Sequence, residues 1–198
     1  VLASLGGGDG SDLERRVLDA TEALLRSSGL RRWSVDDVVD RAGVGRTSVY
    51  RRFDGRDQLV HAVLARELRA TLAAMADAAA AVPDLESKAV AAVHAALEAL
   101  DGSVVDSLLR SDPAVFLPFL TTGAGPLLAI ARTSIAAQVA AVGVEPLPEA
   151  AEAAARFGLS FVLTRDTVLP VHDPQLMDEA VRRMVRPFLV ALGVTAAR

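Results

Sequence analysis

The sequence predicts an all-α fold: an N-terminal three-helix head with a helix-turn-helix, joined through a long helix to a helical C-terminal domain. Apolar residues recur at helical spacing in nearly every segment, and no alternating β-branched run is present. Gly and Pro residues divide the helical stretches. Hydrophobic residues make up 52% of the 198 residues and aromatic ones only 4%, so aliphatic packing must form the core.

The first helix is expected to follow a short Gly-rich arm, residues 1–10, for which we predict flexibility. Either Ser11 or Asp12 can cap this helix, and Gly29 ends it. Five apolar residues share one face at three-and-four spacing: Leu13, Val17, Ala20, Leu24 and Leu25.

Two short helices and a long one are predicted next. Ser34 begins the second helix, with Asp37 three residues later in a capping-box pattern that has Asp in place of Glu. This helix ends at Ala42 and Gly43, and a third follows over 46–53. After an Asp-Gly turn, a fourth helix runs from Arg56 to about Ala81, before Pro83.

The Ala-rich, more acidic remainder is predicted to form further helices over 85–100, 104–109, 113–120, 127–142, 149–164 and 174–192. No linker rich in Pro, Gly or Ser precedes Pro83, so the domain boundary is expected within the fourth helix. We therefore predict one domain over 11–69 and a second over 70–198.

Composition restricts the class of protein. The chain has no cysteine, which excludes disulfides and thiolate sites and fits a reducing cytoplasm. No signal peptide is recognisable at the start of the sequence. Residues 113–131 carry no charge, but Pro118 and the Thr-Thr-Gly-Ala-Gly-Pro run interrupt them, so we expect two buried helices meeting at a turn and no membrane span.

Basic residues concentrate in the first region, although the formal net charge is −4. Residues 41–56 hold five arginines and one acid, Asp54. A basic focus on an acidic chain suits a localised phosphate contact. The alternative is a solvated helix face.

The segment 34–53 carries the sharpest pattern, two short helices around Gly43-Val44-Gly45. Such a tight turn lets the second helix cross the first steeply. With an advance of about 100° per residue, Val49 and Phe53 face the core, whereas Thr47 and Arg51 lie on the opposite side. Ser48 and Tyr50 lie on the flanks.

This outward face predicts contact with double-stranded DNA. Arg51 is the candidate for a bidentate contact with guanine. Arg46, Arg52 and Arg56 are candidates for phosphate contacts, and Ser34 can donate to another phosphate. The pattern alone leaves open an ordinary helical hairpin with exposed arginines.

Residues 11–69 resemble the DNA-binding domain of the TetR family of transcriptional regulators. The match runs in order through Val17-Leu18-Asp19-Ala20, Gly29, Trp33, Ser34-Val35-Asp36-Asp37-Val38, Arg41-Ala42-Gly43-Val44, Ser48-Val49-Tyr50, Phe53 and Leu59. Such a run is more specific than a generic hairpin.

The resemblance implies a homodimer that binds a pseudo-palindromic DNA operator, usually as a repressor, and releases it when a small molecule binds the C-terminal domain. Five residues fall where the family touches DNA: Ser34, Thr47, Ser48, Tyr50 and Arg51. Arg56 replaces a common lysine, and Trp33 takes an aromatic position that packs the head. The chain departs from the family at Gly45, Thr47 and Arg51-Arg52, so a different operator is expected.

The last two predicted helices fit the dimer interface that the resemblance implies. Residues expected there lie in one stripe on each helix: Ala151, Ala155, Gly158 and Val162, and Leu176, Ala180, Met184 and Phe188. The alternative is that these stripes pack only inside one subunit.

An effector cavity is expected among the middle helices. Its candidate lining residues are His94, Phe116, Phe119, Gln138, Phe157 and Phe161. Residues 113–144 contain one charge, Arg132, which favours an apolar effector of unknown identity.

Two other classes of protein fit the sequence less well. An enzyme is disfavoured because the three histidines lack metal-ligand spacing and no phosphate loop or nucleophile motif is present, so we assign no catalytic residue, metal or cofactor. A helical scaffold without DNA function would leave the basic cluster of residues 46–56 unused.

Overall fold

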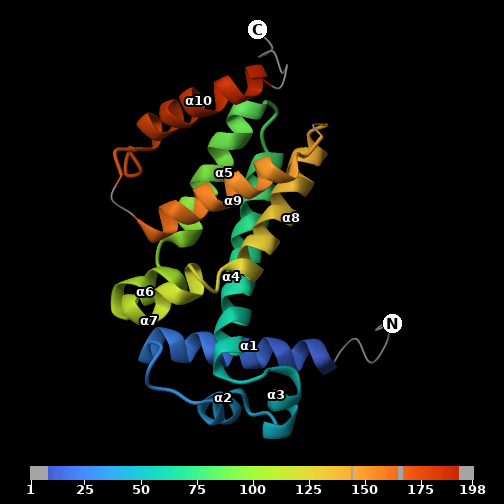
Figure 1. The fold of residues 1–198 in the computed structure, drawn as a ribbon, viewed down its shortest axis with the longest axis vertical. Helices are drawn as coiled ribbons and strands as arrows, with labels where there is room; N and C mark the ends of the chain where they lie inside the picture. Colours follow the sequence, from blue (N-terminus) through green and yellow to red (C-terminus); the bar gives the residue numbers. More distant parts are fainter. Residues whose placement is uncertain (1–8, 144, 165–166, 192–198) are drawn as a thin grey trace. The chain divides into compact units, whose positions relative to one another are not determined.

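The computed structural model describes residues 9–143, 145–164 and 167–191, and within them it contains helices and no strand (Figure 1). The predicted arm, residues 1–10, lies outside the described residues except for its last two. The described helices are α1 (Asp9–Ser28), α2 (Val35–Ala42), α3 (Arg46–Arg52), α4 (Arg56–Ala80), α5 (Leu85–Leu100), α6 (Val104–Ser111), α7 (Pro113–Leu120), α8 (Gly125–Ala141), α9 (Pro148–Leu163) and α10 (Pro174–Ala191). The all-α prediction is confirmed.

The helix ends agree with the local signals to within about two residues. Glycines with a left-handed backbone follow α1 and α2, at Gly29 (φ 65°) and Gly43 (φ 60°), where a residue with a Cβ would be strained. Asp84 caps α5 by accepting from the Ser87 N–H at 2.9 Å, and Ser103 caps α6. Helix α1 begins earlier than predicted, at Asp9.

The described chain divides into two compact units, and the division cuts α4 after Glu67. The first unit comprises α1 to α3, the first half of α4, and residues 103–125 with α6 and α7. The second comprises the rest of α4 with α5, α8, α9 and α10. The sequence had not linked residues 103–125 to the head, and the domain limits at 69 and 70 stay a prediction.

The first unit has an aliphatic core from several helices. Val17, Val38, Val49, Leu59 and Val63 are completely or almost completely buried. Arg66 of α4 fastens this core from outside, since its guanidinium donates to Asp19 and Glu22 of α1, each at 2.6 Å. Helix α1 also packs against α2 and α6.

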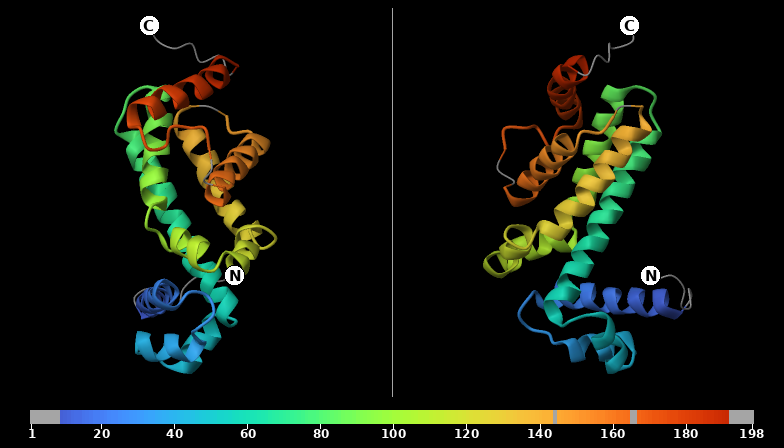
Figure 2. Two further views of the ribbon diagram at one scale, coloured as in Figure 1. Left: turned by 90° about the vertical axis from the view of Figure 1, so that its left-hand side faces the viewer. Right: turned by 45° about the vertical axis from the view of Figure 1, so that its right-hand side comes forward.

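The second unit is held by α5 against α10, which lie side by side (Figures 1 and 2). Val90, Met177 and Val181 form the buried contact between them. Polar pairs border it, with His94 Nε2 2.6 Å from Asp178 Oδ1, and with Arg186 Nε 3.0 Å from Glu86.

Among the described residues no single helix is long and apolar enough to cross a membrane; only the bent pair α7 and α8 reaches that length and hydropathy together.

Candidate nucleic-acid interface

Helix α2 begins with the capping box that the sequence predicted. The Asp37 N–H donates to Ser34 Oγ at 3.3 Å, and the Ser34 N–H donates to Asp37 Oδ2 at 2.6 Å. The hydrogen bond from the Ser34 hydroxyl to the carboxylate, 2.7 Å long, and the one from the backbone hold the pKa of Asp37 below its ordinary value. Residues 34–37 thus fix where α2 starts.

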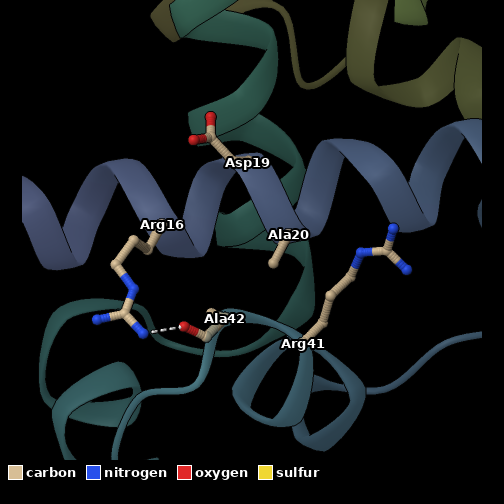
Figure 3. Close-up of a pocket in the computed structure, with 5 residues that line it drawn as sticks. All are labelled: Arg16, Asp19, Ala20, Arg41 and Ala42. Atoms are coloured by element: carbon tan, nitrogen blue, oxygen red, sulfur yellow. Dashed lines mark hydrogen bonds between the residues drawn. The ribbon is translucent and has the colours of Figure 1, made fainter.

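The other end of α2 is fastened to α1. Arg16 donates through Nη2 to the carbonyl oxygens of Ala42 (2.6 Å) and Gly43 (2.8 Å), which satisfies acceptors that a helix end leaves free. Figure 3 shows this bond beside a shallow hollow, with the carboxylate of Asp19 pointing away from it. Arg16 therefore fixes the turn between α2 and α3.

Helix α3 starts without such a cap. Gly45 occupies the N-cap with φ −70° and offers no side-chain hydrogen bond, which confirms that the capping hydroxyl is missing. The helix is anchored by Val49, which is fully buried, and by Phe53, the residue directly after the helix, which is 6% exposed. The predicted inward side of the helix is thereby confirmed.

The outward side of α3 exposes the residues predicted for base contacts. Thr47 and Arg51 are exposed, Tyr50 is 45% exposed and Ser48 is half-buried. Within the described part of the chain, Arg51 has no ion pair, so its guanidinium is open to solvent.

The two arginines beside Arg51 are paired with acids. Arg46 Nε lies 3.2 Å from Asp36 Oδ1, and its guanidinium lies 5.4 Å from the centre of the Tyr50 ring. Arg52 pairs with Glu14 of α1. Because all four charged side chains are more than two-fifths exposed, these pairs contribute little stability, about 0–1 kcal/mol each. Exchange of the carboxylate for a phosphate therefore costs little.

Arg56 has different surroundings. It begins α4, and its guanidinium lies 4.6 Å from the centre of the Trp33 ring. Trp33 is 6% exposed, as its predicted packing role requires. Arg56 has no carboxylate partner among the residues that the structure describes.

These side chains form a compact basic surface on α3 and its borders. Helix α3 carries three arginines, two hydroxyls and a phenol, and a fourth arginine, Arg56, begins α4. Hydrogen-bond donors of this kind suit base edges in the major groove, and flanking cations suit phosphates.

The residues predicted for an effector cavity fall in both units. Phe116, fully buried, and Phe119 belong to the first unit, where the Phe119 ring contacts the His61 ring in a tilted arrangement with ring centres 4.9 Å apart. The others belong to the second: His94, Gln138, Phe157 and Phe161. The His94 ring forms a hydrogen bond with Asp178, and the Phe157 side chain is 58% exposed. The cavity stays a prediction.

The residues predicted for a dimer interface differ in burial. Ala151, Ala155 and Ala180 are buried within the subunit, and Met184 packs against the cluster of Val90, Met177 and Val181. Gly158 and Leu176 are exposed and Val162 is half-buried. The side chain of Phe188 lies outside the described residues.

Sequence reasoning missed the residues that hold this surface in place. Arg16 and Glu14 were assigned no role, and Asp36 was expected only to suit the start of its own helix, although each contacts a residue of α2, the turn or α3. Only the pair of Asp36 and Arg46 had a signal in the nearby sequence, because Asp36 lies in the first turn of a helix and the next helix along the chain is basic. The contacts that Arg16 and Glu14 make from α1 have no such signal, because they join residues 26 to 38 positions apart in the sequence.

Comparison with known proteins points to one family. Residues 17–63 match the family model described as bacterial regulatory proteins, tetR family. This stretch contains α2, α3 and parts of α1 and α4, hence the whole basic surface. No curated protein matches the chain.

Several solved structures share the fold over most of the chain. The TetR family repressor AlkX from Dietzia sp., implicated in biodegradation of n-alkanes, is 21% identical, with a TM-score of 0.73 over 89% of this chain and 97% of AlkX. A transcriptional regulator from Streptomyces coelicolor, SCO7518, is 21% identical with a TM-score of 0.56, covering 87% of this chain and 98% of that one. The fatty acid degradation regulator FadR from Bacillus halodurans is 13% identical with a TM-score of 0.50, covering 99% and 100%. At these identities the likeness concerns the fold.

Proposed function

Because the chain belongs to the TetR family of bacterial transcriptional regulators, we propose that it is a repressor that binds a pseudo-palindromic operator as a homodimer. A small apolar effector releases it. It works on DNA in the cytoplasm, and we assign it no enzymatic step.

The observation that carries this proposal is the outward face of α3. Arg51 is exposed and carries no ion pair among the described residues, while Thr47 beside it is exposed as well. A bidentate arginine–guanine pair discriminates against a wrong base by about 1–3 kcal/mol. Arg46, Arg52 and Arg56 supply sequence-independent attraction to phosphates.

An apolar face on α9 supports the homodimer. Ala150, Ala154, Phe157 and Gly158 are all exposed on it, and the Phe157 ring meets Phe161 edge-on with ring centres 4.9 Å apart. Contiguous apolar surface is uncommon on proteins that stay monomeric. This face shares Gly158 with the predicted stripe on the same helix, whereas Ala151 and Ala155 of that stripe are buried.

Composition and structural neighbours support an effector with an alkyl chain. Helix α7 and α8 carry one charged residue between them, Arg132, and that residue pairs with Glu152 at 2.9 Å. Two proteins of the same fold, AlkX and FadR, are connected with n-alkanes and with fatty acids. An alkyl chain needs an apolar lining and few polar contacts.

Selection of bound sequences from random double-stranded oligonucleotides tests the central claim. We expect a pseudo-palindrome, because two copies of α3 related by a two-fold axis read two half-sites. Arg51→Ala should remove the preference at particular base pairs in each half. Arg183→Ala, which removes an equal charge from an exposed position on α10, is the control and should leave the preference intact. Recovery of no common sequence would refute the proposal.

The subunit contact is tested by measuring molar mass in solution. Phe157→Glu should convert a dimer to a monomer, because it places a charge in the apolar face. Val168→Glu adds the same charge at an exposed position between α9 and α10 and should leave the dimer intact. A dimer that persists in Phe157→Glu would contradict the proposed face.

The effector is tested by displacing a labelled operator with straight-chain fatty acids of increasing length. We expect release to strengthen with each added methylene until the cavity is filled, since each buried CH₂ adds about 0.8 kcal/mol. Acetate is the control. Release that does not depend on chain length would overturn the alkyl assignment.

A further inference from the structure

Arg56 forms no ion pair with any acidic side chain among the residues that the structure describes. Its guanidinium lies against the Trp33 ring, and its Nε and Nη2 atoms are enclosed without an acceptor among the described residues. The third nitrogen, Nη1, is not among the enclosed atoms. Arg46 and Arg52, by contrast, each have a carboxylate partner.

This arrangement is unfavourable in the DNA-free protein. Enclosed N–H groups without acceptors lose the hydrogen bonds that water would give them. A positive charge at the first turn of α4 also opposes the dipole of that helix. The Trp33 ring offsets part of both effects, because its face attracts a cation. An anion at Nη1 would supply the missing charge.

The Trp33 ring cannot turn freely beneath the guanidinium. The ring is almost completely buried, and its indole N–H donates to the Gly29 carbonyl oxygen at 3.0 Å. That carbonyl belongs to the turn that ends α1, where Gly29 has φ 65°. The orientation of Trp33 therefore depends on the turn of residues 29–31.

Asp112, from between α6 and α7, holds that turn. It occupies the N-cap of α7 yet makes no side-chain cap bond there. Instead its Oδ2 accepts from the Leu30 N–H at 3.1 Å, and its Oδ1 lies 3.7 Å from Arg31 Nε. A Cβ on Gly29 would lie 2.3 Å from Oδ2, so the carboxylate fits because residue 29 is glycine.

We propose that Trp33 and Asp112 are positioning residues for DNA binding. Trp33 fixes the plane of the Arg56 guanidinium so that Nη1 meets a phosphodiester oxygen of the DNA backbone, and Asp112 fixes the turn that orients Trp33. This inference rests on the proposed DNA-binding function. It adds that Arg56, unlike Arg46 and Arg52, gains on binding a counter-ion that it does not have beforehand.

The salt dependence of DNA affinity tests the role of Trp33. Arg56→Ala and Trp33→Leu should each weaken binding roughly three- to tenfold per subunit, equally for operator and unrelated DNA. Each should also make the fall of log affinity with log salt less steep by about 0.9 per subunit, the value for one phosphate, and hence by about 1.8 for the dimer. Trp33→Phe keeps an aromatic face but loses the indole N–H bond to Gly29, so its affinity should lie between those of wild type and Trp33→Leu. The double variant should match Arg56→Ala alone.

The double variant separates positioning from a purely structural role. If Trp33→Leu weakens binding further in the Arg56→Ala background, or leaves the salt slope unchanged, Trp33 does not act through Arg56 and the inference is wrong. Wild-type protein that selects no operator would instead refute the proposed function itself.

Asp112 is tested beside a matched helix cap in the other unit. Asp112→Ala should weaken binding roughly two- to fivefold and make the salt dependence of the affinity less steep. In the Arg56→Ala background, adding Asp112→Ala should change neither the affinity nor its salt dependence. Asp84→Ala removes the N-cap aspartate of α5 and should leave the slope unchanged. Equal slopes for the two variants would overturn the role of Asp112.

Trp33 is the one tryptophan of the chain, so its emission gives a readout that needs no substitution of the ring. Phosphate bound at Arg56 changes the charge over the indole and should shift the emission when DNA is added. Arg56→Ala should abolish the shift, whereas Arg51→Ala on unrelated DNA should retain it. A shift that persists in Arg56→Ala would contradict the inference.

Discussion

Helices α2 and α3 have nearly the same length, 8 and 7 residues, but their ends are closed in different ways. Helix α2 has a complete capping box, a left-handed glycine at its C-terminus and an arginine from α1 on its last carbonyl groups. Helix α3 has a glycine N-cap without a side-chain bond and is anchored chiefly by Val49 and Phe53.

The difference separates residues that stabilise the motif from residues that we propose to read DNA. The polar side chains at the ends of α2 are engaged within the protein, so changes there alter stability. On α3 the polar side chains proposed for recognition are exposed or half-buried, and the helix is anchored by two apolar contacts. Sequence-specific binding can therefore change without loss of the fold.

The largest expected effect is on the anchor of α3. Phe53→Ala should destabilise the protein by about 3–5 kcal/mol, because it removes a buried ring and leaves a cavity. Tyr50→Ala, on the exposed side of the same helix, should cost less than about 0.5 kcal/mol. Urea unfolding followed by Trp33 emission measures both. Equal losses would show that α3 is not anchored through its inner face.

The two glycines of the turn should respond oppositely to alanine. Gly43→Ala should cost about 1–2 kcal/mol, since residue 43 has φ 60° and its new Cβ would lie 3.0 Å from Arg16 Nη2. Gly45→Ala should be neutral or stabilise by a few tenths of a kcal/mol, because residue 45 has φ −70° and an ordinary contact with Ser48. Thermal unfolding compares the stabilities of the two variants. Similar losses of stability would contradict the different backbone requirements of residues 43 and 45.

The capping box gives a pH-dependent contribution. Ser34→Ala should cost about 1 kcal/mol at neutral pH. Because the folded pKa of Asp37 lies below the ordinary value of 3.8, the carboxylate stabilises the fold above that value and loses this effect as the pH falls through the folded pKa. The penalty should therefore shrink in acid.

Unfolding measured between pH 7 and pH 3 tests this expectation, with Asp37→Asn as the control in which the effect of Ser34→Ala should not vary with pH. A penalty in the wild-type background that is the same at both extremes would exclude a contribution from the ionised box.

The smallest effect should come from giving α3 the cap it lacks. Gly45→Ser should stabilise by a few tenths of a kcal/mol, because a hydroxyl can accept from the exposed N–H groups of the first turn. The Cβ added at residue 45 meets only Ser48 Oγ, at 3.7 Å. Chemical denaturation resolves this when compared with Gly45→Ala. A loss of stability would show that the turn needs glycine for another reason.

The amino-acid sequence by itself determined the ten helices of the described residues, the position of the helix-turn-helix, and the inward face of α3. These features follow from local signals: apolar spacing, Gly43, Pro83 and the Ser34 capping box all act within a few residues of the chain. The orientation of Thr47 and Arg51 away from Val49 also follows from the helical repeat alone.

Only the tertiary structure decided which partner each arginine contacts. It paired Arg52 with Glu14, placed Arg56 on Trp33, and brought Asp112 to a turn 82 residues earlier. These contacts join segments that are distant in the sequence, so their geometry depends on how helices pack. For the same reason Phe157, predicted as part of a cavity, is exposed on α9. Helical periodicity gives the face of a residue, whereas packing decides which neighbour that face meets.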